Sequence, residues 1–178
     1  MRKVVVYELV ALDGVAEDPD AFILEWDEVM DANLAEVIST QDAVILGRHS
    51  YDEWARFWPS SDIEPFASFI NPVTKFVATS SPLDGGWANA QRIDGDLVGF
   101  VRGLARGDGG DIGVHASLSV ARTLLDAGGV DELRLVVAPR VAGSGRRLLE
   151  GHARRSLHLE RCQSTPSGHL LLDYRLDP

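Results

Sequence analysis

Residues 110 to 139, GDIGVHASLSVARTLLDAGGVDELRLVVAP, decide the fold of this chain. Their pattern predicts a short strand over residues 111–114, a turn of small residues over 115–117, a helix over 118–127 and a second strand over 132–138. Two strands joined by such a crossover helix are expected to pair in parallel. The turn and the helix N-terminus are therefore expected at the carboxyl edge of a sheet.

The start of this helix has two interpretations. Free backbone N–H groups and the positive end of the helix dipole favour a phosphate at this position. Alternatively, Ser117 only caps a structural helix. The residues of the unit allow both.

The composition limits the classes of protein to which the chain can belong. At 178 residues with 45% apolar content, it is long enough for one core, which predicts a single domain over residues 1–178. The 27 acids outnumber the 17 bases, giving a net charge of −10 without a basic cluster. We therefore expect neither a nucleic-acid partner nor an anionic membrane partner, because both would be repelled.

Other classes of site and location are disfavoured by residue counts and spacing. Cys162 is the only cysteine, so an internal disulfide and a cysteine-ligated metal cluster are excluded. No histidine pair has the spacing of metal ligands, and no metal is predicted. No apolar run approaches the ~20 residues that span a bilayer, which predicts a cytoplasmic protein.

The remaining elements complete an alternating pattern. Further strands are predicted at residues 3–11, 43–46 and 75–78, helices at 28–40, 48–58 and 66–70, and a closing hairpin from strands 157–162 and 169–176. Asp94 is expected to cap a helix over residues 96–106, and Gly107 to give it a left-handed exit. The acidic loop over residues 12–27 is expected to be a working surface. This order predicts a three-layer α/β/α fold with a mixed, mostly parallel sheet and a C-terminal antiparallel hairpin.

Three of the predicted strands end in residues suited to phosphate. These strand ends are Gly47-Arg48-His49-Ser50, Thr79-Ser80-Ser81 and His115-Ala116-Ser117. Ligands of such sheets bind beyond the carboxyl ends of the strands. Three such ends together predict an extended ligand with more than one phosphate.

Several motifs in a fixed order add a family resemblance. They are Leu12-Asp13-Gly14, LGRHSY at residues 46–51, NPVTKFV at 71–77, VDEL at 130–133, and Pro139 followed by GSG at 143–145. Through them the chain resembles, nearly end to end, the dihydrofolate-reductase-like proteins related to the C-terminal reductase domain of the bacterial bifunctional riboflavin-biosynthesis deaminase-reductase. The resemblance implies an NADPH-dependent reductase and a homodimer. It also implies a small heterocyclic or sugar-linked substrate, such as that of 5-amino-6-(5-phosphoribosylamino)uracil reductases.

The resemblance also implies roles for individual residues. Gly47, Arg48, His49 and Ser50 would hold the pyrophosphate and the adenosine 2′-phosphate, and Thr79, Ser80 and Ser81 would line the adenosine side. Ala116, Ser117 and Leu118 would offer backbone N–H groups to the pyrophosphate. Asp13 and Gly14 would lie beside the nicotinamide.

The phosphate turn departs from the family pattern. Members of this fold usually have glycine at or next to this turn, where this chain has His115-Ala116. Alanine resists a positive φ, so a turn that needs one at Ala116 should weaken cofactor binding. His115 either adds a donor to the cofactor site or is structural. This departure motivates the alternative function, a non-catalytic nucleotide- or ligand-binding module that keeps the fold.

Asp13 and Asp31 are the candidate catalytic residues. Asp31 follows Trp26 by five residues, similar to the acid that binds the pterin in dihydrofolate reductases. A carboxylate there can pair two N–H donors and support ring protonation, whereas the alternative is a solvated helix acid.

Two further groups have open interpretations. Tyr51, Trp54 and Trp58 form either a core stripe or a stacking wall, and Arg146-Arg147 is either a phosphate grip or a solvated turn.

Overall fold

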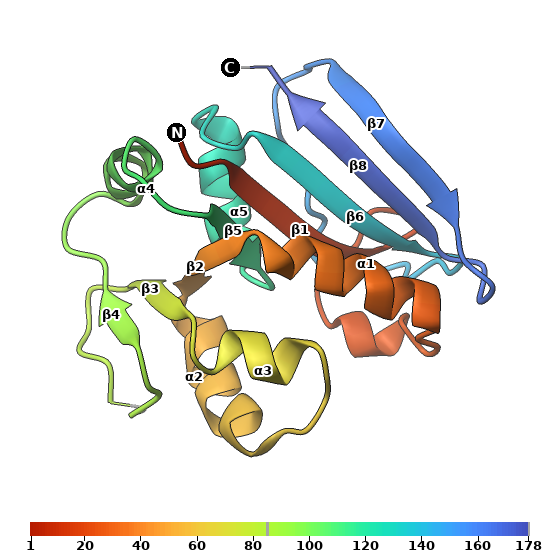
Figure 1. Ribbon diagram of the computed structural model, residues 1–178. Coiled ribbons are helices and arrows are strands. Elements are labelled where there is room, and N and C mark those ends of the chain that lie inside the picture. The colour runs from red at the N-terminus through yellow and green to blue at the C-terminus, as the bar shows by residue number, and fades with distance from the viewer. Residues whose placement is uncertain (85, 178) are drawn as a thin grey trace.

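A computed structural model describes residues 1–84 and 86–177, which form an α/β structure around one eight-stranded sheet (Figure 1). The strand order is β4-β3-β2-β5-β1-β6-β8-β7. The strands are β1 (Val4–Ala11), β2 (Gln41–Gly47), β3 (Thr74–Ala78), β4 (Ala90–Arg92), β5 (Asp111–His115), β6 (Glu132–Ala138), β7 (Leu157–Ser164) and β8 (Leu170–Leu176). The first six run parallel, and β8 and β7 add an antiparallel pair at the β6 side. The predicted fold class is confirmed.

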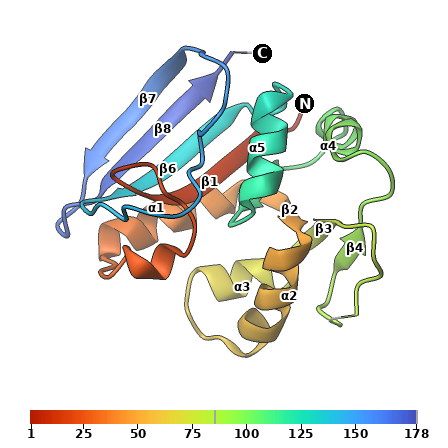
Figure 2. The ribbon, with the colours of Figure 1, turned by 180° about the vertical axis from the view of Figure 1, so that it is seen from behind.

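Helices cover both faces of this sheet. They are α1 (Glu28–Ser39), α2 (Arg48–Phe57), α3 (Phe66–Ile70), α4 (Leu97–Ala105) and α5 (Leu118–Asp126), with short 3-10 turns at Pro19–Ala21 and Trp58–Ser60. One apolar cluster joins α1, α2 and α3 to the sheet, and a second joins α4 and α5 to it. Figure 1 shows α1 in front of the sheet, and the reverse view in Figure 2 shows α5 on the other face.

Strand β1 lies inside the sheet because almost all of its residues can be buried. Its sequence VVVYELVA pairs with β5 on one side and β6 on the other. Val6 and Val10 face α5, while Tyr7 faces the α1 side. A strand covered on both faces has little alternation of polar and apolar residues, as predicted for this segment.

A row of polar side chains fixes the C-terminal hairpin to α1. Tyr7, Arg134, Asp173 and Arg161 lie opposite one another on β1, β6, β8 and β7. The Arg161 guanidinium donates to Asp173 at 2.7 Å and to Glu36 of α1 at 3.1 Å. Partly buried charge pairs of this kind also fix the register of the strands they join.

Three details differ from the sequence prediction. Asp96, and not Asp94, caps α4, since its carboxylate accepts from Gly99 N at 2.6 Å while Asp94 pairs with Arg92. The left-handed exit at Gly107 is also wrong, because among the described residues the positive φ after α4 occurs at Gly109, at 146°. Strand β4 was not predicted.

None of the helices in the described ranges has the length and apolar character needed to cross a membrane.

Candidate functional site

The carboxyl ends of β3, β2 and β5 are neighbours in the sheet, as the predicted site requires. Two hydrogen bonds join the ends of β2 and β5. Gly47 N donates to Ser117 Oγ at 2.9 Å, and Ser50 Oγ donates to Ala116 O at 2.9 Å. The interpretation of Ser117 as a helix cap is wrong, because its hydroxyl bonds across to β2 and makes no cap bond to α5.

Arg48 links the ends of β2 and β3. Its Nε donates to both oxygens of Asp52 at 2.8 and 2.7 Å, and its Nη1 donates to Pro82 O at 2.9 Å. The hydrogen bonds to Asp52 raise the pKa of the guanidinium further above its ordinary value. Arg48 therefore carries a permanent positive charge beside Pro82, which follows Thr79-Ser80-Ser81 in the chain, and a phosphate would share that charge with Asp52.

Two helix N-termini face this edge without side-chain caps. Gly47 precedes α2 and Ser117 precedes α5, and neither side chain bonds to the first turn of its helix. Between β5 and α5, Ala116 has a φ of 53°. The phosphate turn therefore does require a positive φ, and it adopts one with alanine in place of glycine.

The His115 side chain points away from this edge, into the α1 side of the sheet. It is 3% exposed and packs against the rings of Tyr7, Phe66 and Phe69. Its Nε2 lies 2.8 Å from Gln41 Oε1. Burial lowers the pKa of His115 to about 3, so the ring stays neutral. The His115 side chain is therefore part of the core, and only the backbone of His115 contributes to the turn.

Gln41 and His115 leave room only for glycine between them. A Cβ built on Gly113 would lie 2.0 Å from Gln41 Oε1 and 2.7 Å from His115 Nε2. Gly113 is thus required by close approach, because its φ is not positive.

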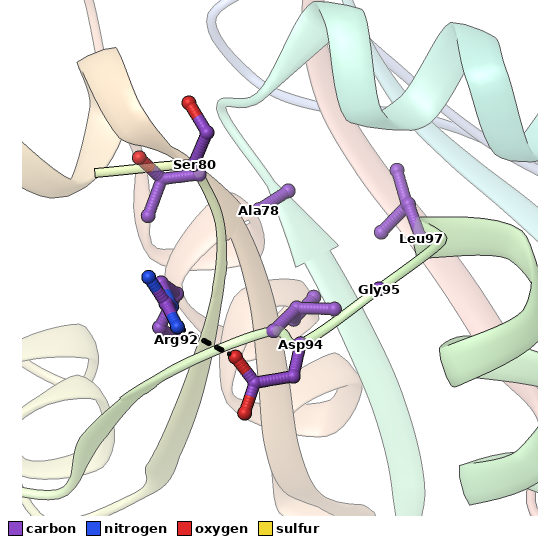
Figure 3. A pocket seen from close by; sticks show the side chains of 8 residues that line it. Ala78, Ser80, Arg92, Asp94, Gly95 and Leu97 are labelled. Carbon is purple, nitrogen blue, oxygen red and sulfur yellow. Dashed lines mark hydrogen bonds and ion pairs between the residues drawn. The ribbon is translucent and has the colours of Figure 1, made fainter. Parts of the chain in front are cut away.

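A hollow of about 370 Å³ lies beyond the ends of β3 and β4. Its lining comprises Ala78, Thr79, Ser80, Arg92, Ile93, Asp94, Gly95 and Leu97. Figure 3 shows the Arg92–Asp94 ion pair, 2.8 Å long, on one side of it and Ser80 on another. Sequence reasoning found the hydroxyls of Thr79 and Ser80 but missed the residues from 92 to 97. The Asp94-Gly95-Asp96 turn was the available signal for them.

Asp13 and Gly14 lie at the end of β1, next to β5. The Asp13 carboxylate accepts from Gly143 N at 2.9 Å and from Ala142 N at 3.2 Å. The Gly143 bond lowers the pKa of Asp13, which keeps the group ionised. Gly14 has a φ of 82° and its Cβ position is open. The structure thus places Asp13 as an anchor for the loop that follows β6.

Asp31 lies on α1, where its Oδ1 accepts a hydrogen bond from Trp26 Nε1 at 2.7 Å. The pair is partly exposed, with Trp26 at 39%. Asp31 and Asp13 make separate contacts on different elements.

The aromatic residues of α2 are mostly packing groups. Tyr51 is buried and forms part of the core on the α1 side. Trp54 and Trp58 pack edge to face with each other, with ring centroids 5.9 Å apart, and both contact Phe66. Tyr51, Trp54 and Trp58 therefore form a core stripe, and the interpretation of these residues as packing groups is confirmed.

Arg146, Arg147 and His49 have local partners. Arg146 Nε donates to Glu17 at 2.6 Å, and Arg147 Nε donates to Asp13 O at 3.0 Å. His49 is exposed on α2 and lies 3.3 Å from Glu53. The arginines join the loop after β6 to the loop after β1.

The family model described as the RibD C-terminal domain matches residues 2–171. The chain belongs to the RibD C-terminal domain family. A relative in Bacillus subtilis (strain 168), the uncharacterized protein YyaP, is 26% identical over 155 residues, which cover 83% of this chain and 80% of YyaP. A second, YwjB, is 28% identical over 147 residues, covering 81% and 80%.

Solved structures share the fold of this RibD C-terminal domain. A protein of Shewanella sp. PV-4 assigned to riboflavin biosynthesis matches with a TM-score of 0.77 at 16% identity, covering 99% of each chain. The diaminohydroxyphosphoribosylaminopyrimidine deaminase/5-amino-6-(5-phosphoribosylamino)uracil reductase of Thermotoga maritima matches at 0.68 and 12%, covering 99% of this chain and 57% of that one. Dihydrofolate reductase from Enterococcus faecalis, complexed with NADP(H), matches at 0.65 and 13%, covering 99% and 97%. The predicted dihydrofolate-reductase-like fold is confirmed.

Proposed function

We propose that this chain is an NADPH-dependent reductase that transfers a hydride to a small heterocyclic or sugar-linked substrate. The observation that carries the proposal is the convergence of the β3, β2 and β5 ends, joined by the Gly47–Ser117 and Ser50–Ala116 hydrogen bonds. Family membership supports it, as do the reductase named in Thermotoga maritima and the NADP(H) complex of the Enterococcus faecalis enzyme.

The residues at this edge fit a phosphorylated dinucleotide. The uncapped starts of α2 and α5 offer backbone N–H groups to a pyrophosphate, with the helix dipoles adding to the attraction. The hydroxyls of Thr79 and Ser80 suit an adenosine in the 370 Å³ hollow, and the guanidinium of Arg48, which bonds to Pro82 O outside the lining of that hollow, suits a 2′-phosphate. When bound, NADPH would supply the hydride.

The protein's own contribution to the reaction would be to position the reactants. Asp31 would hold ring N–H groups of the substrate through its carboxylate, and Trp26 would orient that carboxylate through its 2.7 Å hydrogen bond.

A titration of purified protein with NADPH tests the proposal, with nucleotide fluorescence and melting temperature as readouts. We expect saturable binding of NADPH. In Arg48→Gln, NADPH should bind at least tenfold more weakly while NADH binds as before, if Arg48 holds the 2′-phosphate that NADH lacks. The matched control is Arg56→Gln, an exposed residue of the same helix. No response to millimolar NADPH or NADH would remove the proposal.

The second candidate is a ligand-binding module without turnover. The left-handed Ala116 in the phosphate turn favours it, because a side chain there limits close approach of a cofactor. A thermal-shift screen with nucleotides, pterins and flavins separates the two. Oxidation of NADPH with any reducible compound from that screen, lost in Asp31→Asn but kept in Glu28→Gln, would favour the reductase.

A further inference from the structure

A second hollow lies on the α5 face of the sheet, at the end of the parallel strands that is opposite the candidate cofactor site. It measures about 200 Å³, and its leucine floor consists of Leu125, Leu133, Leu149, Leu157 and Leu176. Leu133 lies near the start of β6, whereas the candidate cofactor site lies beyond the other ends of the parallel strands. At about 3.3 Å per residue, the length of β6 separates the two sites by roughly 20 Å.

A strap formed by residues 148–156 covers part of this hollow. It is tied to α5 at two points, because Arg122 Nη2 donates to Glu150 O at 2.6 Å and the His152 ring bonds to the Asp126 carboxylate. Figure 2 shows the connection between β6 and β7, which contains the strap, passing beside α5. The strap therefore has defined contacts at the wall of the hollow.

The ionisable side chains that line this hollow are all of basic residues. His152, Arg154 and Arg155 contribute to the lining, and both arginines are exposed. Within residues 1–84 and 86–177, no carboxylate oxygen lies within 4.0 Å of either guanidinium. The chain as a whole has a net charge of −10. Arg154 and Arg155 therefore form a local positive patch beside the leucine floor, in contrast to the acidic character of the chain.

We propose that this hollow binds a small carboxylate with an apolar body, such as a short-chain fatty acid or an aryl carboxylate. A cavity of about 150 Å³ lined by leucine-type side chains can hold benzene, so a 200 Å³ hollow accommodates an apolar body of about six carbons. The arginine fork matches the two oxygens of a carboxylate. The acidic surface elsewhere would repel such a ligand, which favours this site over others. The inference does not depend on the reductase function.

The test uses the full chain with ¹³C-labelled leucine methyl groups, titrated with hexanoate and, as a neutral match, with hexanol. Saturable shifts should concentrate on Leu125, Leu133, Leu149, Leu157 and Leu176 with both compounds, and hexanoate should bind at least tenfold more tightly than hexanol. Shifts spread over other leucines, or no saturation by hexanoate at tens of millimolar, would overturn the proposal.

Charge variants test the role of the arginines. The double variant Arg154→Gln/Arg155→Gln should bind hexanoate at least tenfold more weakly and hexanol unchanged. Arg56→Gln/Arg106→Gln, which removes two exposed charges from the ends of α2 and α4, is the matched control and should bind hexanoate normally. Equal weakening in the two double variants would mean that net charge alone governs binding, and would also overturn the proposal.

Discussion

Gly47 N donates a hydrogen bond of 2.9 Å to Ser117 Oγ across 70 residues of sequence, and this bond joins the ends of β2 and β5. It holds the starts of α2 and α5 in one arrangement. A cofactor that bridges both helices would find their N–H groups already placed, which reduces the ordering cost of binding.

Ser117→Ala should therefore weaken both stability and cofactor binding. The lost bond leaves the Gly47 N–H without its acceptor, so the free energy of unfolding should fall by about 1 kcal/mol. NADPH should bind several-fold more weakly. Urea denaturation and NADPH titration measure the two effects, with Ser119→Ala on the exposed side of α5 as the control. If both variants behaved alike, the bond would have no part in holding the site.

Ala116→Gly should strengthen NADPH binding without a large change in stability. Glycine relieves a left-handed alanine, whose cost is about 1–2 kcal/mol. The greater freedom of the unfolded glycine chain offsets about 0.4–1 kcal/mol of that gain. The dissociation constant should fall several-fold, since the backbone becomes open to close approach. Asp18→Gly relieves a similar φ of 49° in the loop after β1 and should leave the dissociation constant unchanged. Unaltered affinity in Ala116→Gly would show that the Ala116 methyl group does not limit binding.

Glu8 should make the protein less stable as the pH rises. It is buried within β1, and burial raises the pKa of its carboxyl from 4.5 to about 8. Between those values the unfolded chain loses a proton that the folded chain keeps, so the free energy of unfolding falls from pH 4.5 to pH 8. Glu8→Gln should remove the part of this decline in the free energy of unfolding that Glu8 causes. The stability of the variant relative to the natural chain should therefore increase from pH 4.5 to pH 8.

Urea denaturation at pH 5, 6.5 and 8 measures the Glu8 effect. The control is Glu28→Gln, which changes an exposed acid on α1. A constant difference between Glu8→Gln and the natural chain at all three values would contradict the expectation.

The two lysines of the chain should contribute very differently to stability. Lys75 is fully buried, and its Nζ donates to the carbonyls of Ile70, Asn71 and Val73 at 2.8 to 2.9 Å. Lys75→Met leaves these carbonyls unsatisfied and should lower the free energy of unfolding by about 2–3 kcal/mol. Lys3 is exposed and pairs with Glu132, so Lys3→Met should cost about 1 kcal/mol or less. Equal losses in urea denaturation would show that the carbonyl contacts of Lys75 are not stabilising.

The pKa of Lys75 predicts a second property of that variant. Burial lowers the pKa from 10.5 to about 8, so the folded chain releases a proton at a lower pH than the unfolded chain does. The unfolded chain binds more protons between pH 8 and 10.5, and stability from this group rises over that interval. Lys75→Met should lack the rise, which denaturation at pH 7.5 and 9.5 can detect.

Local patterns in the sequence were sufficient for most of the fold. The apolar runs located β1, β2 and β5, and the helical spacing located α1 and α5, because burial of one face or two leaves a period in the sequence. Strand β4 has only the three residues AQR, which are partly or fully exposed and carry no such period. The cap at Asp96 was missed because two acids lie two residues apart, and only the backbone geometry selects between them.

The candidate site was less accessible from sequence because its contacts join distant segments. The strand ends were located correctly, since parallel strands must finish at one edge. The partner of the Ser117 hydroxyl, on β2, could not be read locally. The direction of the His115 ring depends on Gln41, which lies 74 residues earlier. The family resemblance places Asp13 beside the nicotinamide, whereas its bonds to the loop after β6 appear only in three dimensions.

The fit of Gly113 against Gln41 and His115 has an evolutionary consequence. Substitution at any one of these three positions is constrained by the residues at the other two. A larger residue at position 113 becomes tolerable only after the Gln41 amide and the His115 imidazole have both been replaced by smaller groups. Related chains that carry a side chain at the equivalent of Gly113 should therefore have exchanged all three residues as a set. Intermediates with only one exchange should be rare.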